Sequence, residues 1–96
     1  MTKADIVAEI AENSGIDKID VQATVEAFMQ QVKIALESGE NVYLRGFGSF
    51  VVKERAEKTG RNISKNTTII IPAHNIPSFK PAKVFIEGVK TKVNIK

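Results

Sequence analysis

The 96-residue chain contains no cysteine and no tryptophan, and its one histidine is His74. Because cysteine is absent, neither a disulfide nor a thiolate metal site stabilises the fold, and a single histidine excludes the ordinary zinc sites. No catalytic constellation surrounds His74, which we interpret as a surface residue. The acidic residues gather in the first half of the chain, as expected for a solvated helix face. The sequence therefore predicts no enzymatic activity, no cofactor, no metal and no small-molecule substrate.

Long hydrophobic runs are also missing. The first residues lack the apolar run of a signal peptide, and no stretch approaches the length that spans a membrane. We therefore expect a soluble, cytoplasmic protein that does not contact membranes. The chain is also short of core: if a ribbon projects from it, only about seventy residues remain to bury apolar surface, which is barely enough for one chain. We expect a second copy to complete the core.

The net charge of +3 is small, but it is unevenly distributed. Residues 1–44 carry three cations and eight acids, a balance of −5, whereas residues 45–96 carry eleven cations and three acids, a balance of +8. Such segregation is typical of nucleic-acid-binding proteins, which present one positive surface. The plainer alternative is that the lysines only keep a small domain in solution.

Local patterns predict two helices in the first half. Thr2 with Asp5 predicts a capping box, and Gly15 ends the first helix. Asp17 is expected to cap the second helix, whose apolar residues recur at three- and four-residue spacings up to Gly39.

The second half predicts strands and a ribbon. A short strand at 42–44 and a glycine turn precede a strand at 49–55, with Phe50 and Val52 on one face. Residues 53–65 are rich in cations and form the first limb and tip of a long antiparallel ribbon that returns along residues 67–71. Pro72 and Pro77 lack the backbone N–H that a central strand donates, so they indicate that the returning limb lies at the edge of a sheet. Pro81 is expected at the first position of a last helix.

Five stretches of the second half form a distinctive combination: Gly46-Phe47-Gly48-Ser49-Phe50, Arg55, Thr59-Gly60-Arg61-Asn62, Ile71-Pro72-Ala73 and Pro77-Ser78-Phe79-Lys80-Pro81-Ala82-Lys83. Through them the chain closely resembles the bacterial HU/IHF histone-like DNA-binding proteins over residues 1 to about 90. The resemblance implies an α+β fold: an intertwined dimer with a helical base, a small antiparallel sheet and two protruding β-ribbon arms that embrace duplex DNA through the minor groove.

The resemblance also implies that residues 1–96 form a single domain with four parts. Residues 1–40 would form the helical dimerisation part, 41–80 the sheet and DNA-binding arm, 81–90 the C-terminal helix and 91–96 a short tail. The protein would be nucleoid-associated and would bend and compact DNA with little sequence specificity.

Two positions depart from the family pattern. Ile63 stands where the family usually has a proline that wedges between base steps. Isoleucine is apolar and of suitable size, so we expect it to act as the wedge; the plainer alternative is a packing or turn residue. Asn66 stands where glycine is common, and asparagine tolerates the left-handed backbone of a tight turn.

The expected DNA contacts follow from the charge pattern and the resemblance. Lys80 and Lys83 flank the start of the last helix, where free N–H groups favour a phosphate. Lys3 is either a DNA contact or a solvated lysine, and Gly46 either admits a phosphate or only shapes a turn. The full set is Lys3, Gly46, Lys53, Arg55, Lys58, Arg61, Asn62, Ile63, Lys65, Lys80 and Lys83.

Three alternatives stay open at this stage. Binding could be general, as in HU, or site-selective, as in IHF. The partner subunit could be a second copy or a paralogue. In a different class of function, an exposed β-ribbon could recruit a protein by strand addition, although a cationic arm argues against this.

Overall fold

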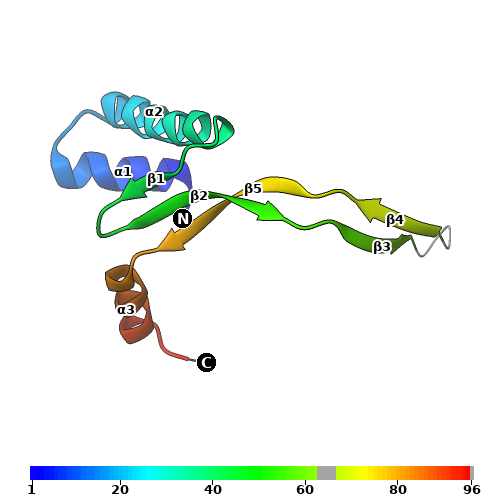
Figure 1. Ribbon diagram of the computed structural model, residues 1–96. Helices are drawn as coiled ribbons and strands as arrows, with labels where there is room; N and C mark the ends of the chain where they lie inside the picture. Colours follow the sequence, from blue (N-terminus) through cyan, green and yellow to red (C-terminus); the bar gives the residue numbers. More distant parts are fainter. Residues whose placement is uncertain (63–66, 96) are drawn as a thin grey trace.

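The computed structural model describes residues 1–62 and 67–95. Its elements in chain order are α1 (Lys3–Ser14), α2 (Lys18–Glu37), β1 (Val42–Leu44), β2 (Gly48–Arg55), β3 (Lys58–Asn62), β4 (Thr67–Ile71), β5 (His74–Pro81) and α3 (Lys83–Lys92). The helices α1 and α2 lie together over a small sheet, and a long two-stranded ribbon projects from that body. Helix α3 follows the end of β5 that is remote from the ribbon (Figure 1). The molecule is accordingly elongated, with extents of 58 × 36 × 29 Å.

The ends of α1 follow the local sequence. The Asp5 backbone N–H donates to the Thr2 hydroxyl at 3.3 Å, and the Thr2 N–H donates to the Asp5 carboxylate at 2.9 Å. Gly15 ends the helix in the left-handed conformation with φ 76°, and its N–H donates to the Ala11 carbonyl. The predicted capping box and glycine C-cap are confirmed.

The predicted N-cap position of α2 is confirmed, but the predicted side-chain cap is absent. Asp17 occupies the N-cap position, but its side chain accepts no capping hydrogen bond. Its backbone carbonyl accepts from the Val21 N–H at 3.0 Å instead. Because Asp17 is exposed, water can solvate its carboxylate and the N–H groups of the first turn equally well.

The sheet has the order β1-β2-β5 and is antiparallel throughout, and β3 pairs with β4 in a separate two-stranded ribbon. The register of β2 with β5 is unbroken from Gly48 opposite Pro81 to Arg55 opposite His74. Beyond that pair, both strands leave regular structure together, at residues 56–57 on one side and 72–73 on the other. This junction separates the body from the arm, the name used here for β3 and β4.

The prolines behave as edge residues, with one correction. Pro77 lies in β5, which is an edge strand, as predicted. Pro81 does not start the last helix: it is the final residue of β5, and α3 begins at Lys83 with Ala82 as its N-cap. The Ala82 N–H donates to the Phe47 carbonyl at 2.9 Å, which holds the chain extended for two residues beyond the predicted start.

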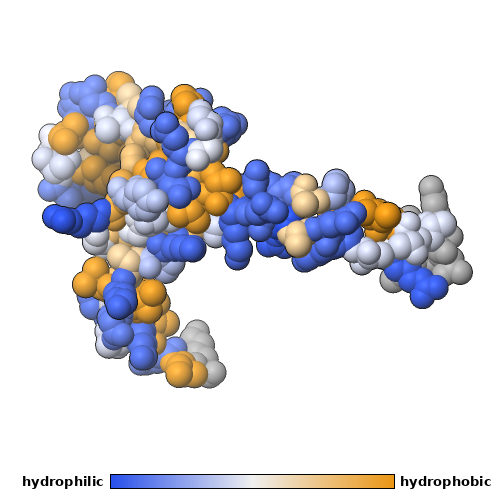
Figure 2. Space-filling view, in the orientation of Figure 1, coloured by the Kyte–Doolittle hydropathy of each residue, from blue (hydrophilic) through white to orange (hydrophobic). Residues whose placement is uncertain are grey.

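Within the described residues, the single chain leaves its apolar side chains poorly covered. Only Val7 and Val21 are buried hydrophobic residues. The rings of Phe47, Phe50 and Phe79 cluster with centroids 4.9 and 5.2 Å apart, yet Phe47 is 45% exposed and Phe79 is 36% exposed. Hydrophobic side chains show on the body and along α3 in Figure 2. No helix among the described residues is both long and apolar enough to span a membrane.

Candidate nucleic-acid interface

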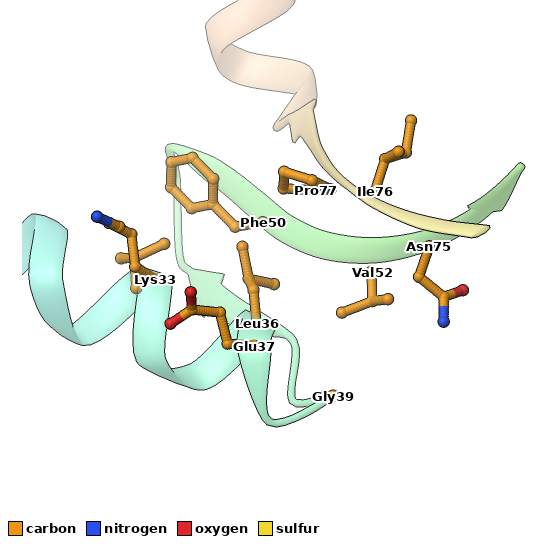
Figure 3. A pocket seen from close by; sticks show the side chains of 10 residues that line it. Lys33, Leu36, Glu37, Gly39, Phe50, Val52, Asn75, Ile76 and Pro77 are labelled. Atoms are coloured by element: carbon orange, nitrogen blue, oxygen red, sulfur yellow. The ribbon is translucent and has the colours of Figure 1, made fainter.

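The two faces of the sheet differ in character. Phe50 and Val52 of β2 extend toward α2, where they line a hollow with Val32, Leu36 and other residues (Figure 3). This confirms the predicted shared face of Phe50 and Val52. Because side chains alternate along a strand, Ser49, Val51, Lys53 and Arg55 project from the other face.

The face away from α2 gathers cations from two strands. Directly opposite residues of paired strands share a face, so Lys80 joins Ser49 there and His74 joins Arg55. Lys53, Arg55 and Lys80 are all exposed. The sequence identified these three cations, and the register shows that they belong to one surface, here called the cationic face.

The arm carries cations on both of its faces. Lys58 pairs with Ile71 and Arg61 pairs with Thr68. Lys58 and Arg61 are three positions apart, which is an odd number, so their side chains project to opposite faces of the strand. In Figure 2, hydrophilic surface predominates on the part of the projecting ribbon that is next to the body.

The remaining predicted contacts of residues 53–65 are Asn62, Ile63 and Lys65. Asn62 is the last residue of β3. Ile63 and Lys65 lie outside the described residues.

The arm also exposes three consecutive isoleucines. Ile69, Ile70 and Ile71 of β4 are 46, 64 and 44% exposed. By alternation, Ile69 and Ile71 share the face of Lys58, and Ile70 shares the face of Arg61. Each face of the arm therefore combines a cation with apolar surface, which suits a groove lined by both phosphates and sugars.

The turn between β1 and β2 adjoins the start of α3. Gly46 adopts φ 81°, a left-handed conformation that favours glycine, and the space where its Cβ would lie is open. The Phe47 carbonyl accepts from the Ala82 N–H, so this turn lies beside the first residues of α3. Both predicted roles of Gly46 fit this geometry: the turn needs its backbone conformation, and a phosphate could approach it without obstruction.

The start of α3 offers unused donors. Ala82 provides no side-chain cap, so the N–H groups of the first turn have no side-chain partner at this end of the helix. Lys83 is the first helical residue and is exposed. A helix N-terminus with an adjacent cation is a favourable place for a phosphate.

Sequence reasoning missed Arg45. It is exposed in the same turn as Gly46. The charge count included it, but its place beside the start of α3 depends on the Phe47–Ala82 hydrogen bond, which joins segments far apart in the chain. The sequence did offer one indication of Arg45 as a DNA contact, because it directly precedes Gly46, a glycine already proposed to lie near a phosphate.

Lys3 stands apart from the other predicted contacts. Its Nζ forms an ion pair with the Glu26 carboxylate at 3.2 Å, with both side chains about half exposed. The structure thus places Lys3 on the acidic helical part, where its charge is partly offset. Among residues 1–62 and 67–95 no cluster of three or more side chains could hold a metal ion.

Comparison with known proteins is consistent with this geometry. The family model described as bacterial DNA-binding protein matches residues 1–90. The SPbeta prophage-derived DNA-binding protein HU 2 of Bacillus subtilis is 42% identical over 96% of this chain and 100% of the relative. The integration host factor subunit alpha of Aliivibrio fischeri is 43% identical over 86% of this chain and 85% of its own. An Anabaena HU–DNA cocrystal structure matches with a TM-score of 0.89 and 37% identity, covering 93% of this chain and 97% of the other.

Proposed function

The chain belongs to the bacterial DNA-binding protein family of HU and integration host factor, and from this membership we propose that it binds duplex DNA through the minor groove, bends it and compacts it. It is an architectural DNA-binding protein and not an enzyme. The observation that carries the proposal is the projecting arm, with Lys58 and Arg61 on its two faces and the cationic face at its base.

The contacts divide into two groups. At the base, Lys80, Lys83 and Arg45 surround the turn and the start of α3, and these we assign to phosphates. Along the arm, Arg61 enters the minor groove and Ile63 acts as the apolar wedge at the tip. The other proposed contacts are Lys3, Gly46, Lys53, Arg55, Lys58, Asn62 and Lys65.

The functional unit in this proposal is a homodimer. The exposed Phe47, Phe79 and Phe85 support it, since a second copy of the chain would cover them. We assign residues 1–40 and the apolar side of the sheet to dimerisation and residues 41–81 to the sheet and arm. The C-terminal helix is Lys83–Lys92, two residues later at each end than the expected 81–90. The dimer would act in the cytoplasm, on the nucleoid.

The arm supports binding with little sequence specificity better than it supports site-selective binding. Its cations reach phosphates and the minor groove, which carries a degenerate base pattern. The HU relative and the integration host factor relative are almost equally similar to this chain, at 42 and 43% identity, so identity does not separate general from site-selective binding. Footprinting on a random-sequence duplex separates them: even protection indicates the first, and discrete protected sites indicate the second.

Duplex DNA titrated at several salt concentrations tests the function. Each neutralised phosphate contributes about −0.9 to the slope of log affinity against log salt. Lys80→Ala and Lys83→Ala should each weaken binding to every duplex and flatten that slope. Lys18→Ala, which removes an exposed cation from the start of α2, is the matched control and should leave the slope unchanged. An affinity for duplex DNA that is independent of salt would contradict the proposal.

A further inference from the structure

His74 occupies a position that its sequence context did not reveal. It is the first residue of β5 and lies directly opposite Arg55, the last residue of β2, at the end of the sheet where the arm begins. Directly opposite residues of an antiparallel pair have Cβ atoms about 5 Å apart and project from the same face. His74 is therefore exposed on the cationic face, beside a proposed DNA contact.

A backbone hydrogen bond fixes the chemistry of the imidazole ring. His74 Nδ1 lies 2.9 Å from the Pro72 carbonyl oxygen. A carbonyl oxygen can only accept, so Nδ1 carries the proton in this bond. Nε2 is then the ring atom that gains or loses a proton, and when it is protonated the ring becomes a cation with an outward N–H donor.

The surroundings of the ring favour an anionic ligand. On the cationic face, β2 contributes Arg55 directly opposite His74 and Lys53 on the diagonal. Glu54 projects from the other face beside Asn75, and Glu57 lies in the connection between β2 and β3. A phosphate placed between His74, Arg55 and Lys53 would be within reach of donors from all three side chains.

We propose that His74 is a further DNA contact, which donates a hydrogen bond from protonated Nε2 to a phosphate at the base of the arm and so makes binding stronger as the pH falls. This inference rests on the proposed function, since the phosphate belongs to the bound duplex. Protonation and DNA binding are linked: DNA favours the charged ring, and the charged ring favours DNA by the same free energy.

Affinity measured at two pH values tests the proposal. Suitable values are about pH 5.5 and pH 8, and His74 is the chain's one histidine, so a single substitution removes every imidazole. For two arms in a dimer we expect binding to be about three- to tenfold tighter at the lower pH, given the usual strength of exposed ion pairs. The magnitude of the salt slope should also increase by about 0.9 for each added phosphate contact.

Two variants separate this contact from other effects of pH. His74→Gln keeps a polar side chain without a titrating group, and its affinity should be the same at both pH values. His74→Arg carries a fixed charge and should bind at the higher pH as tightly as the parent does at the lower one. Calorimetry in two buffers of different ionisation enthalpy should show net proton uptake on binding by the parent and none by His74→Gln.

The outcomes distinguish this contact from the function on which it depends. If the parent and His74→Gln bind DNA with the same pH dependence and the same proton uptake, His74 does not contact phosphate, while the DNA-binding function stands. If the parent binds no duplex at either pH, the proposed function itself fails.

Discussion

At the scale of single residues, Gly48 determines how closely the two central strands and the aromatic cluster can approach. A Cβ at this position would lie 2.5 Å from the Lys80 carbonyl oxygen and 2.7 Å from the Phe79 ring. The backbone oxygen cannot move aside without breaking the register of β2 with β5. We expect Gly48→Ala to lower the free energy of unfolding by about 1–3 kcal/mol, the usual range for overpacking.

Chemical denaturation measures that loss, and Gly88→Ala is the control. Gly88 lies in α3 with open space where a Cβ would be, so alanine there should stabilise the protein by roughly 0.5–1 kcal/mol through helix propensity. Equal stabilities for the parent and Gly48→Ala would show that the close approach is not needed.

Substitution of Ile63 tests whether this side chain wedges between base steps. Ile63→Ala removes apolar area but no charge, so its salt slope should match the parent while DNA bending falls, because the wedge offsets an unstacking cost of a few kcal/mol per base step. Arg61→Ala should flatten the slope and reduce bending, with the greater loss on AT-rich DNA, whose narrow minor groove attracts arginine. Energy transfer across a labelled duplex measures the bend. Parent-like bending by Ile63→Ala would show that Ile63 is only a turn residue.

At the scale of elements, the start of α1 depends on the charge of one carboxylate. The hydrogen bond from the Thr2 backbone N–H lowers the pKa of the Asp5 carboxyl below its ordinary value, and the Thr2 hydroxyl lowers it further. Because the folded-state pKa is depressed, the stabilisation is complete above the unfolded-state pKa and is lost as the pH falls through the folded-state pKa.

Asp5→Asn should therefore destabilise the protein near neutral pH and make progressively less difference in acid. Thermal unfolding of the parent and the variant across an acid pH series measures this. Glu9→Gln, on the same helix and exposed, is the control and should not reproduce the effect. A difference between the parent and Asp5→Asn that stays constant down to strong acid would contradict the capping role.

The arm is an element with little support of its own. Among the described residues it consists of two paired strands with no third strand beside them, and such ribbons are marginally stable in water. Amide hydrogens of β3 and β4 should therefore exchange faster than those of β2 and β5 in the body, and bound duplex DNA should slow them. Equal protection in the arm and the body of the free protein would contradict this.

How far the sequence predicts these elements depends on how local their causes are. The capping box of Thr2 and Asp5 and the edge position of Pro77 follow from residue chemistry and close spacing. The start of α3 could not be predicted, because the Ala82–Phe47 hydrogen bond joins distant segments. For the same reason the cations of the candidate interface were recognised from composition, whereas their shared face, and the place of Arg45 beside α3, required the strand register and the chain path.

At the scale of the whole molecule, the uncovered aromatic cluster links folding to assembly. Phe79→Ala should remove area from a core shared by two chains, with a cost of about 3–5 kcal/mol if the ring is fully covered in the dimer. Sedimentation at micromolar concentration should give a dimer for the parent, and its unfolding temperature should rise with protein concentration.

Tyr43→Ala is the control for assembly. Tyr43 lies opposite Ser49 and therefore projects from the cationic face, away from Phe50 and Phe79, so its loss should leave the association unchanged. A folded monomeric parent would show that the chain does not need a second copy.

The junction at residues 56–57 and 72–73 gives the molecule a hinge. Both strands lose regular pairing at the same level, and Pro72 lacks the N–H that would continue a ladder. We therefore expect the arm to change its angle relative to the body at this junction, so that one body could hold duplexes of different curvature. In that case we expect the stiffness of the DNA to influence which segments are bound, because a kinked, nicked or easily bent duplex costs less energy to deform than a stiff, straight one.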